Sequence, residues 1–308
     1  MGNYVKMLLL IDGSNLARRS YEKFKKLKSS DGKNTGLIYG FMRLLYQYVN
    51  RFQPTYLIVT FDTKQSKSTN FRNKLIPEYK AHREKLNLSF DYEDFNTQLS
   101  VLRKLLKSLN VTYLWDKKGL GHEADDYIAY FTKHHTGKVI IISSDKDFGQ
   151  LVDNRVKLFN PSKEDIVRVD NCKEVYGYEV SECVDYLCLV GDKSDDIPGY
   201  KGIGPVKARK FLDQFGSVDK FLKDPSSEFP GIDKEGLKYL YKVNRKLIDL
   251  NLALEKYPIK KLPLLFNKKD KIYINKFISI LEEYSLRSFQ TEEFITPFKK
   301  LKRWKENQ

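Results

Sequence analysis

The segment Met7–Asn15 (MLLLIDGSN) sets a short apolar run directly before an aspartate and a turn. Similar runs, rich in β-forming residues, recur at residues 56–61, 111–114, 139–142 and 156–159. The longer stretches between them are amphipathic, at residues 36–52, 94–109 and 123–134. Because strands that alternate with crossover helices form parallel sheets, the first half of the chain is predicted to be an α/β fold built on a parallel sheet.

The organisation of the chain changes near residue 178, where strand-like runs end and helical patterns take over. Residues 63–93 are rich in lysine and arginine and have almost no apolar periodicity, so we expect this stretch to cross over an edge of the sheet. We therefore predict three regions: an α/β core at 1–177 that carries the basic excursion, a helical region at 178–258, and a C-terminal helical segment with a basic tail at 259–308.

The charge balance indicates a polyanionic partner. The 308 residues include 55 Lys and Arg against 40 Asp and Glu, which gives a formal charge of +15. A nucleic acid or an acidic membrane face would suit such a surface. Three cysteines without a CxxC pair and four histidines disfavour a zinc site or a disulfide scaffold. The apolar run Met7–Ile11 is too short for a signal sequence or a membrane span, so we expect a cytoplasmic protein without a membrane partner. We also expect the protein to be a monomer.

Acidic side chains follow three of the predicted strands. Asp12 comes directly after the first run, Asp62 after the second, and Asp145 with Asp147 just after the run at 139–142. The carboxyl ends of parallel strands share one edge of an open sheet, so these carboxylates should meet in one cleft there. For any single aspartate the alternative is that it caps the helix after its strand.

Two further acidic groups belong to the same hypothesis. They are Glu123, Asp125 and Asp126 at the opening of a predicted helix, and Asp192, Asp195 and Asp196 in a turn-rich segment. Acids in a first turn are also common simply because the helix dipole favours them. Ten carboxylates in one cleft would repel one another unless a multivalent cation neutralised them. Because all the donors are oxygens, two Mg²⁺ or Mn²⁺ ions are the expected cofactors.

The distribution of charge then indicates a class of substrate. With these ten carboxylates set aside, 30 acidic residues remain against 55 basic ones. An acidic, metal-holding cleft within a strongly basic body suits the cleavage of a nucleic acid, because the body can neutralise phosphates while the metals do the chemistry.

A glycine-rich turn at 199–204 leads into a predicted helix that opens with Pro205. Backbone N–H groups at such a helix start can hold a phosphate irrespective of base sequence. The alternative is an ordinary corner between two helices. On the first interpretation, the duplex-binding residues are Gly202, Ile203, Gly204, Lys207, Arg209 and Lys210.

In their order along the chain, these motifs resemble those of the 5′-nuclease superfamily, which contains flap endonucleases, bacteriophage 5′-3′ exonucleases and the 5′-nuclease domain of bacterial DNA polymerase I. The resemblance covers residues 8–216. It rests on Asp12-Gly-Ser-Asn15, Phe61-Asp62, Pro77–Arg83 (PEYKAHR), Glu123-Ala-Asp125-Asp126, Ser144–Phe148 (SDKDF), Gly191–Asp196 (GDKSDD) and Gly202-Ile-Gly204. It implies a PIN-like core, a helical arch over the active site, and a helix-hairpin-helix (helix-three-turn-helix) that grips duplex DNA, often with a bound K⁺.

The resemblance also implies roles for single residues. The arch residues Lys80 and Arg83 would contact the scissile phosphate, and Tyr79 would stack on a terminal nucleobase. Asp196 stands where many polymerase-type relatives have asparagine, and its role is left open. The implied metal ligands or near-ligands are Asp12, Asp62, Glu123, Asp125, Asp126, Asp145, Asp147, Asp192 and Asp195.

Together these patterns predict a Mg²⁺-dependent, structure-specific 5′-nuclease, acting as flap endonuclease and 5′-3′ exonuclease on branched or nicked DNA and on RNA/DNA 5′ ends. It would remove RNA primers during replication in a bacterial cell or a phage-infected host. The alternative is a non-catalytic, junction-binding replication protein on the same fold. An aspartyl phosphotransferase is disfavoured, because Ser14 stands where a second aspartate would be needed. Phe294 and Phe298, near the basic tail, would either dock a replication-protein partner or pack on their own domain.

Overall fold

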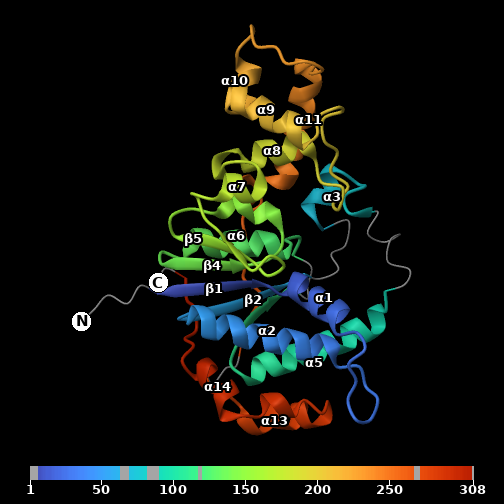
Figure 1. The fold of residues 1–308 in the computed structure, drawn as a ribbon, viewed down its shortest axis with the longest axis vertical. Helices are drawn as coiled ribbons and strands as arrows, with labels where there is room; N and C mark the ends of the chain where they lie inside the picture. Colours follow the sequence, from blue (N-terminus) through green and yellow to red (C-terminus); the bar gives the residue numbers. More distant parts are fainter. Residues whose placement is uncertain (1–5, 63–68, 82–89, 117–119, 267–270, 307–308) are drawn as a thin grey trace, which may run out of the picture.

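A seven-stranded sheet with the order β6-β5-β4-β1-β2-β3-β7 forms the centre of the protein (Figure 1). The computed structural model describes residues 6–62, 69–81, 90–116, 120–266 and 271–306. The strands are β1 (Met7–Asp12), β2 (Tyr56–Phe61), β3 (Thr112–Trp115), β4 (Lys138–Ile142), β5 (Val156–Asn160), β6 (Asp165–Val167) and β7 (Leu264–Leu265). The five inner strands run parallel, and β6 and β7 pair antiparallel at the two edges. The predicted α/β core with a parallel sheet is confirmed.

Helices cover both faces of the sheet: α1 (Gly13–Lys23), α2 (Gly36–Phe52) and α5 (Tyr92–Ser108) on one face, and α6 (Ala124–His134) on the other (Figure 1). Alternate side chains of β1 enter two hydrophobic cores, as the two-residue period of a strand requires. Leu8 and Leu10 belong to the core on the α6 side, whereas Leu9 and Ile11 belong to the core under α1, α2 and α5. Because the sheet is buried on both faces, its parallel strands appear in the sequence as continuous apolar runs.

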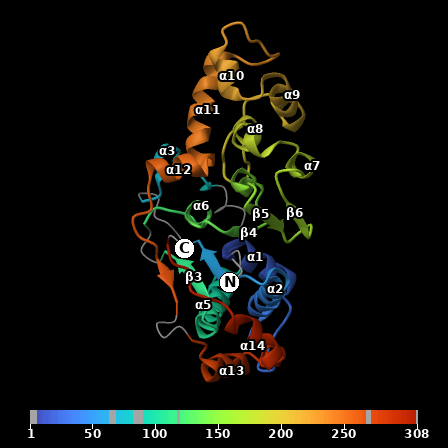
Figure 2. The same ribbon diagram turned by 90° about the vertical axis from the view of Figure 1, so that its left-hand side faces the viewer.

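The helical region rises from one side of the sheet as a narrow extension (Figures 1 and 2). It contains α7 (Cys172–Tyr176), η2 (Val180–Glu182), α8 (Cys183–Val190), α9 (Pro205–Phe215), α10 (Val218–Lys223), α11 (Lys234–Ile248) and α12 (Leu250–Lys256). Its core is continuous with the core on the α6 side of the sheet. At the junction, Gln150 of η1 (Lys146–Leu151) donates from Nε2 to the Ile248 carbonyl at 3.0 Å and accepts at Oε1 from Leu250 N–H at 2.8 Å. The helical region is therefore packed against the α/β core rather than loosely tethered to it.

The C-terminal segment lies at the opposite end of the molecule, where α13 (Ile274–Glu283), η3 (Arg287–Phe289) and α14 (Glu292–Lys299) cover α2 and α5 (Figures 1 and 2). Phe294 and Phe298 are both buried, and the Phe294 ring stacks on Tyr46 with 5.0 Å between centroids. These two aromatics thus pack on their own domain, which was the alternative to partner docking. Within the described ranges, every helix is too short or too polar to span a bilayer.

Removing part of a central side chain should destabilise the fold. Leu10 is fully buried in β1, so Leu10→Ala should lower the free energy of unfolding by about 2–5 kcal/mol through lost burial and the cavity left behind. Urea denaturation followed by circular dichroism measures this change. Leu120→Ala is the matched control, because Leu120 is 46% exposed and should lose much less. Equal losses in the two variants would contradict the central position assigned to β1.

Candidate active site

The sheet brings the first three predicted carboxylates to one edge. Asp12 ends β1, Asp62 follows β2, and Asp145 lies just after β4, and these three strands are direct neighbours in the sheet. Asp12 also accepts hydrogen bonds, at Oδ1 from Asn15 N–H (3.0 Å) and at Oδ2 from the Ser143 hydroxyl (2.9 Å). Asp12 therefore caps α1 and also lies close enough to Asp62 and Asp145 for their charges to act on it.

The amino end of α6 joins the same edge through Asp62. Its Oδ1 accepts from Ala124 N–H at 2.9 Å, and its own N–H donates to Ser14 Oγ at 2.7 Å. These bonds fix the first turn of α6, which carries Asp125, against the ends of β1 and β2. The four elements that the sequence predicted to meet at this edge do meet there.

Burial and mutual repulsion act together on these carboxylates. Burial, and then the negative charges of Asp62 and Asp145, raise the pKa of Asp12 to about 7. Burial and the charge of Asp145 likewise raise the pKa of Asp125 well above its usual range. Such shifts arise when like charges crowd into a site with little water, and they are relieved by a cation placed between them.

A second acidic group, Asp147, Asp192 and Asp195, lies beside Asp145 and extends the acidic cluster toward the helical region. Burial and the charges of Asp145 and Asp192 raise the pKa of Asp147 well above its usual range. Among the described atoms, Asp147 Oδ1 is buried and has no hydrogen-bond partner. A buried carboxylate oxygen without a donor is costly, and a hard divalent cation is the partner that it suits.

The turn that holds Asp192 depends on its backbone conformation. Gly191 has a φ of 75°, and a Cβ there would lie 2.3 Å from the backbone nitrogen of Gly199. Asp196 has a φ of 57°, in the left-handed region that aspartate and asparagine tolerate better than most residues. Asp196 thus occupies a position of the turn that asparagine could also occupy.

Glu123, two residues before Asp125, is held by positively charged side chains. Its Oε2 accepts from Lys80 Nζ at 2.7 Å and from the Tyr79 hydroxyl at 3.0 Å, and Lys80 Nζ also lies 3.6 Å from Asp195. Although burial acts to raise it, the charges of Lys80 and Arg72 lower the pKa of Glu123 to about 2. The ammonium group of Lys80 therefore balances acids from both the α/β core and the helical region.

Tyr79 differs from its predicted role as a stacking platform. Its side chain is only 4% exposed, and its ring belongs to the hydrophobic core on the α6 side of the sheet. Its hydroxyl is bound to Glu123 and lies 3.3 Å from Asp195 Oδ2. In this conformation Tyr79 orients carboxylates and its ring is not available to a nucleobase.

Asp126 also differs from its prediction as a metal ligand or near-ligand. Arg72, in α3 (Phe71–Leu75), donates to Asp126 from both terminal nitrogens, at 2.9 and 2.7 Å, and from Nε to the Leu247 carbonyl at 3.1 Å. Asp126 Oδ2 also accepts from Glu123 N–H at 2.9 Å. Both oxygens are committed to this buried network, so we assign Asp126 a structural role. Sequence reasoning missed Arg72 because it sits in a lysine-rich stretch, where its apolar neighbour Phe71 was the only sign of burial.

The hairpin before α9 divides the predicted DNA-binding residues into two groups. Gly202, Gly204, Lys207 and Lys210 are exposed, whereas Ile203 is buried and anchors the turn. Arg209 instead forms a bidentate pair with Glu182, at 2.6 and 2.8 Å. Neighbouring residues of a helix point in different directions, so Arg209 faces η2 whereas Lys210 is exposed. The Arg209 side chain therefore stabilises the hairpin, and its charge is already paired with Glu182.

The carboxylate oxygens suit divalent ions, but in this conformation the side chains are not arranged to coordinate one. Within the described ranges, no group of three acidic, histidine or cysteine side chains is arranged closely enough to hold a metal. Carboxylates without a cation between them repel and take other partners, as Glu123 does with Lys80. Arg83, the second predicted arch cation, lies outside the described residues.

Comparison with known proteins identifies the family. Residues 7–177 match the 5′-3′ exonuclease N-terminal resolvase-like domain, and residues 178–255 match the 5′-3′ exonuclease C-terminal SAM fold. The 5′-3′ exonuclease of Aquifex aeolicus is 34% identical over 91% of this chain and 95% of its own length. This chain belongs to the 5′-3′ exonuclease family.

Two further similarities extend this finding. DNA polymerase I of Deinococcus radiodurans is 34% identical over 91% of this chain, but the match spans only 29% of that polymerase. A bacteriophage T5 D15 flap endonuclease, solved in complex with DNA and metal ions, shares the fold with a TM-score of 0.65 and 20% identity, over 91% of this chain and all of that one. The expected class of fold, and membership of the 5′-nuclease superfamily, are thereby confirmed.

The buried Arg72 should be important for stability. Replacing it with methionine leaves Asp126 as an unpaired buried charge, so Arg72→Met should lower the free energy of unfolding by about 3–5 kcal/mol. Arg168→Met is the matched control, because Arg168 pairs with Asp170 on the surface and such pairs contribute less than about 1 kcal/mol. Chemical denaturation measures both changes, and a loss below about 1 kcal/mol for Arg72→Met would contradict the buried network.

Proposed function

We propose that this protein, a structure-specific 5′-nuclease, hydrolyses phosphodiesters with two Mg²⁺ or Mn²⁺ ions held by the carboxylates at the sheet edge. The observation that carries the proposal is the crowding of Asp12, Asp125, Asp145 and Asp147, whose pKa values are raised by burial and by neighbouring carboxylates. Two divalent cations would relieve this repulsion. The proposed ligands or near-ligands are Asp12, Asp62, Glu123, Asp125, Asp145, Asp147, Asp192 and Asp195.

Divalent ions bound among these carboxylates would supply an activated water and stabilise the charge that develops on the phosphate in the transition state. The chain itself supplies orientation. Hydrogen bonds from Asn15 and Ser143 fix the Asp12 carboxylate, and one from Ala124 fixes that of Asp62, so these ligands are held before any substrate arrives. Lys80 sits at the rim, where its ammonium group can transfer from Glu123 to a substrate phosphate once the acids are otherwise neutralised.

The exposed side of the hairpin suits a duplex. Lys207 and Lys210 project from the first turns of α9, and the exposed Gly202 and Gly204 leave open space around the backbone before it. Contacts of this kind hold phosphates without reading bases. We propose that the duplex part of a branched or nicked substrate lies here, with its 5′ strand at the carboxylates. The T5 flap endonuclease of the same fold was solved with DNA and metal ions, and this supports the proposed arrangement.

Replacing a single proposed ligand should separate cleavage from binding. Asp145→Asn and Asp192→Asn keep the shape of the side chain but remove a negative charge that the metals need. Each should reduce Mg²⁺-dependent cleavage of a labelled 5′ flap by more than roughly 100-fold, beyond the loss typical of groups that only support a ligand. Binding of the flap in EDTA should change little, because the duplex contacts lie on the hairpin.

The comparison is made on flap, nicked and blunt substrates, with and without Mg²⁺. Asp170→Asn is the matched control, because Asp170 is exposed and lies outside the cleft. Full activity in both Asp145→Asn and Asp192→Asn would refute the site, and so would cleavage by the unmodified protein that does not require a divalent ion.

Replacing Lys80 should lower the rate of cleavage much more than the affinity for DNA. Lys80→Ala removes a cation that faces the developing charge, so kcat should fall by about 10²–10³-fold while the Kd for flap DNA changes far less. Lys74→Ala, an exposed cation of α3, is the matched control and should leave kcat nearly unchanged. Single-turnover cleavage and equilibrium binding separate the two effects. An equal loss in both would instead give Lys80 a positioning role.

A further inference from the structure

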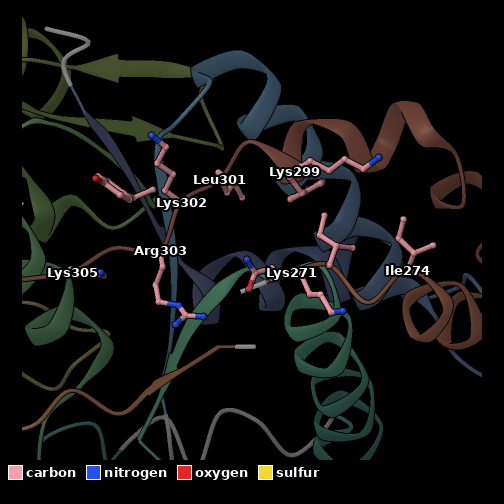
Figure 3. Close-up of a pocket in the computed structure, with 11 residues that line it drawn as sticks. Lys271, Ile274, Lys299, Leu301, Lys302, Arg303 and Lys305 are labelled. Atoms are coloured by element: carbon pink, nitrogen blue, oxygen red, sulfur yellow. The ribbon is translucent and has the colours of Figure 1, made fainter. Parts of the chain in front are cut away.

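A cavity of about 650 Å³ lies at the amino ends of β2 and β3, at the opposite edge of the sheet from the carboxylates (Figure 3). Tyr56, the first residue of β2, lines it, as do Asn110 just before β3 and Ile274 at the start of α13. The amino and carboxyl edges of a parallel sheet are separated by the length of its strands, so this cavity is distinct from the active site.

The walls of the cavity are built by two segments that are anchored to the sheet. The chain after α14 returns to β2, where Lys302 N–H donates to the Thr55 carbonyl at 2.8 Å and Lys302 bridges to Tyr56. Two residues later, Trp304 is buried edge-on against Phe131 at 5.0 Å. On the other side, Tyr273 N–H donates to the Ser108 carbonyl at 2.8 Å. The lining residues are therefore held in place by backbone bonds and packing.

Positive charge dominates the lining. Five cationic side chains surround the cavity, and no carboxylate is found among the described residues that line it. They come from the segment before α13 and from the end of α14 and the tail after it (Figure 3): Lys271, Lys299, Lys302, Arg303 and Lys305. Lys299 also pairs with Glu292 outside the cavity, so its charge is partly balanced. A multivalent anion could contact several of these cations at once, and such charge-assisted contacts are stronger than neutral ones.

Apart from Asn110, the rest of the lining is mostly apolar. Ile272, Ile274 and Leu301 line the cavity together with the buried rings of Tyr56 and Phe298. The volume falls within the roughly 300–1,000 Å³ typical of small-molecule sites, which combine an apolar lining with a few polar groups that fix orientation. The cavity is partly open to solvent, and its volume suits a compact ligand. A chain of phosphates attached to a flat, less polar group matches both parts of this lining.

We propose that this cavity binds a nucleoside polyphosphate. The phosphates lie among the lysine and arginine side chains, and the nucleoside lies against the apolar part formed by Ile272, Ile274 and Leu301. The site is a binding site separate from the nuclease centre, and no reaction is assigned to it.

The test measures binding of fluorescently labelled dATP to the full chain by anisotropy. EDTA is present throughout, so that the carboxylate cleft holds no metal and repels the nucleotide. The test variant is Lys302→Glu/Lys305→Glu, which reverses two charges of the lining without touching the backbone bond of Lys302. The control is Lys220→Glu/Lys223→Glu, which makes the same change of net charge on exposed residues of α10. Unlabelled dATP, inorganic tripolyphosphate, deoxyadenosine and a 5′-phosphorylated single strand serve as competitors.

We expect saturable binding that weakens about tenfold or more in the test variant and stays within about twofold in the control, because charge-assisted contacts are lost only in the first. Unlabelled dATP should compete better than tripolyphosphate or deoxyadenosine, since each of those satisfies only half of the lining. The proposal is overturned by an absence of saturable binding or by equal weakening in both variants. It is also overturned if tripolyphosphate competes as well as dATP, or if the single strand displaces dATP equally well.

Discussion

The repulsion among carboxylates gathered at one edge of a parallel sheet is the constraint on which the rest of the structure depends. Strands β1, β2 and β4 end side by side, and each delivers an aspartate to that edge. The raised pKa values of Asp12 and Asp125 show that this arrangement disfavours their ionised forms. A fold would not keep so many acids together for stability alone, because fewer of them would stabilise it more. The proposed role, in which the site holds cations and through them the phosphates of a nucleic acid, accounts for this cost.

Two cations of the chain moderate the same repulsion in different ways. Arg72 is buried and bidentate on Asp126, which makes it a permanent part of the core and ties α3 to α6 and α11. Lys80 is partly exposed, and it spans Glu123 of the α/β core and Asp195 of the helical region. A lysine at the rim can exchange its partners as the charge of the site changes, whereas the buried arginine cannot. Structural support and the proposed role toward substrate thus belong to two different residues of one short basic segment.

Much of this could be predicted from the sequence, because the signals were local. The five parallel strands follow the apolar runs within a residue or two. Asp12 and Asp62 come directly after the first two runs, and Asp145 follows the run at 139–142 after two serines. The antiparallel strands β6 and β7 were missed, since segments of three and two residues carry no periodicity of their own. The partners described for Arg72, Tyr79 and Arg209 lie 27 or more positions away along the chain, so no local sequence pattern reveals them. Tertiary pairing, rather than residue type, decides which charges are structural.

The central claim is that acids from distant parts of the chain form one pocket for two divalent ions. Anomalous diffraction at the manganese edge, from crystals of the unmodified protein grown with Mn²⁺, measures this directly, because it locates each ion without reference to activity. The account predicts two peaks among Asp12, Asp125, Asp145, Asp147 and Asp192, about 3.5–4 Å apart. No peak in the cleft, or manganese bound only elsewhere on the surface, would contradict it.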